Sequence, residues 1–102
     1  MVPLSGLLSG LGLSSEQESL REVASLFAKD KIRPVAAGLD ERAEFPRAII
    51  QEGHGLGLIN LTIPAEYGGS GLGIFDACLV IEEIAWGCSG FGTSMVANDL
   101  AL

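Results

Sequence analysis

The second half of this chain has no lysine and no arginine. All six Lys and Arg residues of the 102-residue sequence lie at or before Arg47, and the formal net charge is −7. Proteins hold nucleic-acid phosphates with clustered Lys and Arg, so nucleic acid is not expected as a partner. A complete site for a nucleotide phosphate is not expected in the second half either, because only backbone N–H groups or another polypeptide could neutralise its charge.

Cysteine and histidine are scarce as well. The chain has two cysteines, Cys78 and Cys88, and one histidine, His54. At about 100° per residue, positions ten apart lie on different faces of a helix, so these thiols predict no metal site. We interpret them as buried free thiols in a reducing compartment. A single histidine also leaves zinc and Ser/His/Asp sites without enough parts. His54 is interpreted as a cation or carbonyl partner at a helix end.

No apolar run approaches the roughly 20 residues that a membrane-spanning helix needs. The opening stretch, MVPLSGLLSGLGL, lacks the basic start of a signal peptide and the arginines of a transit peptide. We interpret residues 1–13 as a flexible leader and expect a soluble, intracellular protein. Because 48% of the residues are hydrophobic and a domain of this size has a thin core, we also expect apolar surface that faces a partner domain or subunit.

What the sequence does contain is a series of helical patterns. Two overlapping capping boxes, Ser14 with Gln17 and Ser15 with Glu18, precede a run with one apolar face. This combination predicts a helix that begins here. Pro34 predicts either a kink or the first turn of a short second helix, which ends within the stretch GLDERAEF.

Three more segments follow. A third helix is expected from Pro46 to about Gly55, whereas LINLTIP at 58–64 is too short to form a sheet alone and is treated as irregular. Residues 74–87 are apolar on almost all sides, which predicts a buried helix. A last helical pattern runs from Thr93 to the end of the chain without a capping signal. The sequence therefore predicts an all-α fold of four to five helices, truncated in the last helix.

The stretch IPAEYGGSGLG, residues 63–73, is the most glycine-rich part of the chain. Gly69 and Gly71 have the first spacing of a dinucleotide fingerprint, but Ile74 stands where the third glycine belongs. The Lys-Ser/Thr ending of a P-loop is also missing. We favour a structural turn into the following helix, with phosphate contact as the alternative.

Two side-chain clusters are further candidates for a site. Glu82 and Glu83 could act as an acid/base pair, but neighbours on a helix point about 100° apart. We expect one of them to face solvent and the other to pair with a neighbouring element. Trp86, Phe91 and Met95 gather at the last interhelical junction, where they form either core packing, which composition favours, or the wall of an apolar ligand site.

Several motifs occur in a fixed order: a Ser-x-x-Gln helix start, RPVAA, a Phe-Pro opening of the third helix, GLGLINLTIPAEYGGSGLG and EEIAWGCSG. In this order and spacing, the sequence resembles the N-terminal helical domain of the acyl-CoA dehydrogenases, with similarity to medium-chain members. The resemblance covers nearly everything after the leader. It assigns 14–102 to that domain, incomplete at its C-terminal end.

The resemblance implies a three-part FAD enzyme with helical, β-rich and helical domains, commonly a homotetramer. FAD lies between domains and subunits and takes a hydride from the β-carbon of an acyl-CoA substrate, while a carboxylate of the C-terminal domain removes the α-proton. Electron-transfer flavoprotein is a candidate acceptor. The expected location is the bacterial cytoplasm, or the mitochondrial matrix in a eukaryote.

Most of this machinery would lie beyond Leu102, so the resemblance assigns no catalytic base and no FAD contact to these residues, and the chain alone is expected to be inactive. It does assign the floor of the acyl pocket to the helix after GCSG. The matching residues are Gly92, Thr93, Val96, Ala97 and Leu100. Similar medium-chain members carry larger polar residues at the positions of Gly92 and Val96, which predicts a longer or bulkier acyl group here.

The sequence is also compatible with two other functions. Within the same family, the scaffold also serves flavin-dependent oxidases and monooxygenases. Outside enzymes, the chain could be a helical interaction module whose apolar surface binds a partner.

Overall fold

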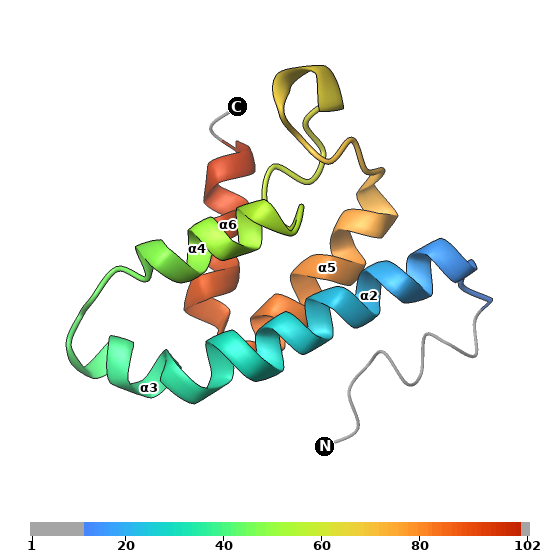
Figure 1. Cartoon of the computed structure of the whole chain (residues 1–102). Coiled ribbons are helices and arrows are strands. Elements are labelled where there is room, and N and C mark those ends of the chain that lie inside the picture. The colour runs from blue at the N-terminus through green and yellow to red at the C-terminus, as the bar shows by residue number, and fades with distance from the viewer. Residues whose placement is uncertain (1–11, 101–102) are drawn as a thin grey trace.

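The computed structural model describes residues 12–100, and all of its regular structure is helical (Figure 1). The elements in chain order are α2 (Ser15–Phe27), a π-helical turn (Ala28–Ile32), α3 (Arg33–Glu41), α4 (Arg47–Gly55), a 3₁₀ turn (Ala65–Tyr67), α5 (Ile74–Gly87) and α6 (Ser89–Leu100). The all-α prediction is therefore confirmed for this part of the chain. The predicted leader falls mostly on residues 1–11, and the predicted end of the last helix on 101–102. Both lie outside the described residues.

The start of α2 is held by the predicted capping box on Ser14. The Ser14 hydroxyl accepts a hydrogen bond from the Gln17 backbone N–H at 3.1 Å, and the Gln17 side-chain oxygen accepts one from the Ser14 N–H at 3.0 Å. Ser15 is already the first helical residue, so the overlapping box that starts there is not the one that caps the helix. Gln17 also donates to the Asp76 carboxylate at 2.8 Å, which ties α2 to the first turn of α5.

Pro34 lies in the first turn of α3, just after the π-helical turn. The backbone N–H of Arg33 donates to the carbonyl of Ala28, five residues earlier, which is the π-helical bond. A proline ring clashes with the carbonyl four residues before it and has no N–H to donate. The wider turn accommodates both effects, so α2 and α3 continue as one bent helical run.

Helices α2 and α5 run side by side in the same direction (Figure 1). Near the end of this contact, Gly87 lies against the π-helical turn: a Cβ on Gly87 would lie 3.1 Å from the Ala28 Cβ and 3.2 Å from Ile32 Cγ2. On α4, Gly53 similarly lets Phe27 and Met95 approach the backbone. Small residues therefore set how closely these helices pack.

The core lies where α2, α5, α6 and the segment after α4 meet. Its buried members are Ala24, Phe27, Ala28, Ile32, Leu58, Ile59, Leu61, Ala77, Val80, Ile84, Phe91 and Met95. Trp86 is half-buried against this cluster, with the Arg33 guanidinium 4.8 Å from its ring centroid. The structure therefore confirms that Trp86, Phe91 and Met95 take part in core packing, as composition favoured.

The predicted start of the last helix was wrong. Helix α6 begins at Ser89, not Thr93, because Cys88 alone interrupts the chain with an extended backbone (φ −168°, ψ 123°). Gly90 and Gly92, which precede the predicted start at Thr93, lie inside α6. Glycine lowers helix propensity by about 1 kcal/mol. Burial of Phe91, which is only 4% exposed, favours the helix in this turn.

The glycine-rich loop folds back on the segment before it. Leu72 N–H donates to Leu61 C=O at 2.8 Å, Gly71 N–H to Ile63 C=O at 2.8 Å, and Ser70 N–H to Asn60 C=O at 3.0 Å. Gly71 has a positive φ of 64°, which glycine adopts without strain. Because these N–H groups bond to the chain's own carbonyls, the geometry favours the structural turn over a phosphate loop.

Candidate functional site

An open groove of about 350 Å³ lies between helices α5 and α6. Its lining residues are Ile81 and Ala85 from α5, and Ser89, Gly92, Thr93, Val96, Ala97 and Leu100 from α6. All five residues that the sequence analysis assigned to an acyl-pocket floor are among them. They recur at three- and four-residue spacing, so they share one face of α6. We call this surface the α5–α6 groove.

The α5–α6 groove is mostly apolar, since Ser89 and Thr93 are the two polar residues among its eight lining residues. The Thr93 hydroxyl donates to the Ser89 carbonyl one turn earlier, at 3.0 Å. At Gly92 the two helices approach closely, since a Cβ there would lie 3.3 Å from the Ala85 Cβ. Leu100, 82% exposed, lies at the last turn of α6. The groove therefore offers hydrocarbon surface on a narrow floor.

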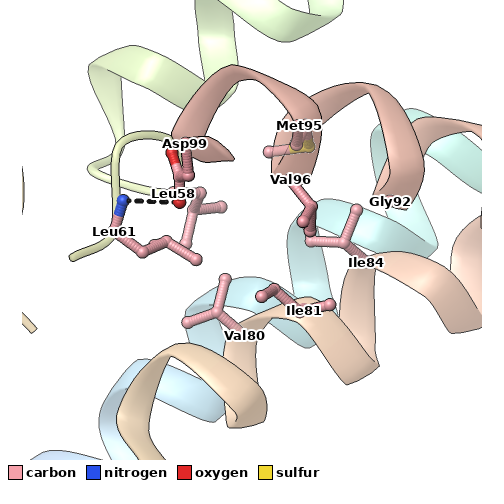
Figure 2. A pocket seen from close by; sticks show the side chains of 9 residues that line it. All are labelled: Leu58, Leu61, Val80, Ile81, Ile84, Gly92, Met95, Val96 and Asp99. Carbon is pink, nitrogen blue, oxygen red and sulfur yellow. Dashed lines mark hydrogen bonds between the residues drawn. The ribbon is translucent and has the colours of Figure 1, made fainter. Parts of the chain in front are cut away.

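A small, partly open void, whose walls Figure 2 shows, shares lining residues with the α5–α6 groove. It measures about 10 Å³, close to the space of one water molecule. Ile81, Gly92 and Val96 line both the void and the groove. The remaining walls are Leu58, Leu61, Val80, Ile84, Met95 and Asp99. The two spaces therefore have three lining residues in common.

Asp99 is the charged residue in this void's wall. One oxygen, Oδ2, accepts a hydrogen bond from the Leu61 backbone N–H at 3.2 Å (Figure 2). The other, Oδ1, is buried, and no group among residues 12–100 donates to it. Beside it, Asn98 Nδ2 donates to Asn60 Oδ1, and Asn60 has a left-handed backbone (φ 56°). These two contacts tie the end of α6 to the segment after α4.

Glu82 and Glu83 differ in burial and do not line the groove. Glu83 is only 4% exposed, and Glu82 is half-buried. Burial, and next the neighbouring Glu83 charge, raise the pKa of the Glu82 carboxyl above its ordinary value of 4.5. The expected ion pair with a neighbouring element is not found for either residue within the described range. Glu83 is thus the inner carboxylate and Glu82 the more exposed one, while a partner for Glu83 in another domain stays a prediction.

His54 is exposed in the last turn of α4, at the predicted helix end. Cys88 is half-buried, but Cys78 is exposed, so the prediction of two buried thiols was wrong for Cys78. Cys78 belongs to an apolar stretch of the sequence, but it lies on the exposed side of α5. Between residues 12 and 100, no three His, Cys, Asp or Glu side chains converge as metal ligands would. The helices of the same region are too short or too polar to cross a membrane.

Part of the site was not identified from sequence. Ile81 and Ala85 complete the α5–α6 groove, and their four-residue spacing was the only available signal. Asp99 was missed because its environment is made by a loop far away in the sequence. A separate hollow of about 410 Å³ lies on another face of α6, beside Phe45 and Phe91, and no motif pointed to it.

The chain is similar in sequence to known acyl-CoA dehydrogenases. The sequence model of the family described as "Acyl-CoA dehydrogenase, N-terminal domain" matches residues 14–102. A "Probable medium-chain specific acyl-CoA dehydrogenase 2, mitochondrial" from Caenorhabditis briggsae is 37% identical over 90 residues, 88% of this chain and 22% of that protein. The "Isovaleryl-CoA dehydrogenase, mitochondrial" of Pongo abelii is 37% identical over 90 residues, 86% of this chain and 21% of that protein. A "Benzylmalonyl-CoA dehydrogenase" of Aromatoleum aromaticum is 34% identical over 88 residues, 86% of this chain and 23% of that protein. The chain thus spans about a fifth of the length of these relatives.

Proposed function

The chain belongs to the acyl-CoA dehydrogenase family, and we propose from this that it contributes the floor of the acyl pocket to an FAD-dependent enzyme that oxidises acyl-CoA thioesters between Cα and Cβ. The observation that carries the proposal is the α5–α6 groove. It gathers Gly92, Thr93, Val96, Ala97 and Leu100 on one face of α6 and adds Ile81 and Ala85 from α5.

The chemistry of the groove supports an acyl chain as its ligand. Its surface is mostly hydrocarbon, and the Thr93 hydroxyl is already bonded inside α6. Each methylene that leaves water contributes about 0.8 kcal/mol. Gly92 and Val96 keep the floor small and apolar, so we propose a longer or bulkier acyl group as substrate.

The described residues do not fit a flavin site by themselves. The N–H groups of Ser70, Gly71 and Leu72 bond to backbone carbonyls of the chain, and no Lys or Arg follows Arg47 to meet a pyrophosphate. In the proposed enzyme, FAD and the base that removes the α-proton are therefore supplied by other parts of the protein. A homotetramer, electron-transfer flavoprotein as acceptor, and a cytoplasmic or mitochondrial-matrix location are further proposals that rest on the family alone.

A chimera tests the proposal, because the chain spans about a fifth of its relatives. Residues 14–102 replace the corresponding segment of the Caenorhabditis briggsae relative, and flavin absorbance and acyl-CoA-dependent dye reduction are measured against the unmodified parent. We expect a yellow protein that converts saturated acyl-CoA to the 2-enoyl product. A second chimera that exchanges only residues 74–100 provides the same test with a smaller graft.

The outcome that contradicts the proposal is a chimera with the parent's flavin content that no acyl-CoA reduces. Substrate size is tested in the same assay with straight acyl-CoAs from four to sixteen carbons. We expect the kcat/KM optimum to move to longer chains than in the parent. A sharp preference for four carbons would exclude the proposed substrate size but not the reaction.

A further inference from the structure

We propose that the hollow between α3 and α6 is a docking site for another segment of the same enzyme, one that places an apolar side chain in the hollow and a Lys or Arg beside Asp40. The hollow is distinct from the α5–α6 groove, because none of the described residues lines both. The inference therefore goes beyond the proposed function: it requires a larger enzyme around this chain, but no acyl chain in the groove.

The wall of the hollow combines apolar side chains with carboxylates. The hollow measures about 410 Å³, which is within the range of protein pockets that hold ligands. Leu39, Phe45 and Phe91 give it large apolar side chains, whereas Asp40 and Glu44 bring carboxylates. Phe45 is 59% exposed. An apolar side chain of a partner would therefore find hydrocarbon to pack against and a negative charge next to it.

Helix α3 is poorly covered on the side of this hollow. None of its nine residues is buried, whereas α2, α4, α5 and α6 each bury at least one residue. Ala36 and Leu39 line the hollow and are only half-buried. Most of the stability of helices in proteins comes from the packing of an apolar face. A segment that fills the hollow would provide α3 with packing that the described residues do not.

Charge specifies the chemistry of that segment. Asp40 and Glu41 form the end of α3, where the helix dipole is already negative, and no basic residue stands in its last turn. Arg42 comes next, but its guanidinium pairs with the Glu44 carboxylate at 2.9 Å. Among residues 12–100, Asp40 has no ion-pair partner. A segment that covers Asp40 must therefore bring a cation, because a covered charge without a partner destabilises the complex.

The rest of the enzyme is the expected source of the segment. The chain spans about a fifth of the length of its relatives, so most of such an enzyme lies outside it. Within this chain, the second half has no Lys or Arg, and Arg47 lies over the Phe45 ring, with its guanidinium carbon 5.5 Å from the ring centroid. A second copy of the chain is a poorer partner, because each copy carries a net charge of −7.

Thiol labelling of the chimera that carries residues 14–102 tests whether the hollow is covered. Ser94 lines the hollow and is exposed in this structure, so Ser94→Cys puts a thiol where a docked segment would shield it. We expect a maleimide to react with this thiol at least about tenfold more slowly in the folded chimera than in urea, since a covered site reacts only when the structure opens. Asp30→Cys, at an exposed position of the π-helical turn, is the control and should react rapidly in both states.

Charge variants test the predicted cation. Asp40→Lys, combined with Ser94→Cys, should raise the labelling rate toward that in urea, because the new ammonium repels the Lys or Arg of the docked segment. Asp40→Asn should have a smaller effect in the same direction. Asp30→Lys makes the same change of charge at an exposed site outside the hollow and is the matched control. Peptide mass spectrometry reports the labelling of each cysteine separately.

Only chimeras with the flavin content of the parent are compared. The proposal is overturned if Ser94→Cys reacts as fast in the folded chimera as in urea, or if Asp40→Lys labels like Asp30→Lys. Protection that is lost on dilution would assign the hollow to contacts between enzyme molecules and would also overturn it. If Asp40→Lys loses its flavin, Asp40→Asn decides the question.

Acyl-CoA turnover by the same samples tests the proposed function separately. Turnover by a chimera whose Ser94→Cys thiol reacts freely would reject the docking site and leave the proposed function intact. A protected thiol in a flavin-loaded chimera without turnover would support the docking site and reject the proposed function.

Discussion

Gly69 lies directly against the main chain of Ile63, so that a Cβ built on Gly69 would fall 2.5 Å from the Ile63 carbonyl carbon. This contact is backbone against backbone, and neither partner can rotate away. The Ile63 carbonyl also accepts the Gly71 N–H at 2.8 Å. The glycine-rich loop is therefore closed by a contact that any side chain at position 69 would break.

Gly69→Ala is expected to lower the free energy of unfolding by about 3 kcal/mol, because the loop must move to make room for the methyl group. The control is Gly73→Ala. Gly73 has an extended backbone (φ −73°), and a Cβ there would meet nothing within 4 Å, so we expect a loss below about 1 kcal/mol. Urea unfolding followed by circular dichroism measures both. Equal losses would show that the contact with Ile63 is unimportant.

Ser14→Ala is expected to cost about 1 kcal/mol of stability, because Ser14 is the residue that caps α2. Ser15→Ala is the matched control: the same atom is removed one residue later, at the exposed first position of the helix, and we expect little change. Thermal unfolding of the two variants at neutral pH compares them. A larger loss for Ser15→Ala would mean that the second capping box holds the helix in solution.

Glu82→Gln is expected to raise stability at neutral pH. Burial and the Glu83 charge raise the pKa of Glu82 above 4.5 in the folded chain, so the folded state favours the protonated, neutral carboxyl. The stabilisation from that proton is complete below the unfolded pKa of about 4.3 and is lost as the pH rises through the folded pKa. Glutamine imitates the neutral form at every pH.

The advantage of Glu82→Gln over the parent chain should therefore be present at pH 7 and disappear near pH 4. Unfolding free energies at several pH values measure it. Glu66→Gln, at an exposed position of the 3₁₀ turn, is the control. An advantage of the same size at both ends of the pH range would exclude the titration of Glu82 as its cause.

Val96→Phe is expected to shorten the α5–α6 groove. If the ring takes the space of about two methylenes, the loss is roughly 1.6 kcal/mol, or somewhat more than tenfold in kcat/KM for long acyl chains. Four-carbon substrates should be affected much less. Kinetics of the chimera over the chain-length series measure this.

Ser94→Phe is the control for this prediction, because it adds a ring on another face of α6, where Ser94 lines the separate hollow beside Phe45. A uniform loss at all chain lengths in Val96→Phe, or the same profile in Ser94→Phe, would contradict an acyl chain in the groove.

Much of the fold could be predicted because its signals are local. The Ser14 cap, the proline of α3, and the bounds of α4 and α5 depend on neighbours within one or two turns, and they were predicted to within a residue or two. The start of α6 was predicted four residues late. In that turn, glycines argue locally against a helix, and the burial of Phe91 in the core favours one.

The candidate site likewise has a part that could be predicted from sequence and a part that could not. The residues on one face of α6 could be named from sequence, because both the motif resemblance and the three- and four-residue spacing can be read within that one helix. Ile81, Ala85 and Asp99 could not, since their roles depend on which helix or loop packs beside them.

The sequence by itself determined that the described part of this protein is helical, that a capping box at Ser14 precedes α2, that Pro34 marks the start of α3, and to which family the chain is similar. These properties follow from hydrogen bonds and side-chain periodicity within a few residues. Only the tertiary structure decided that Leu61 approaches Asp99 and that Ile81, Gly92 and Val96 line both the groove and the void. Such contacts join positions up to 38 residues apart, and their geometry is set by how closely whole helices can pack.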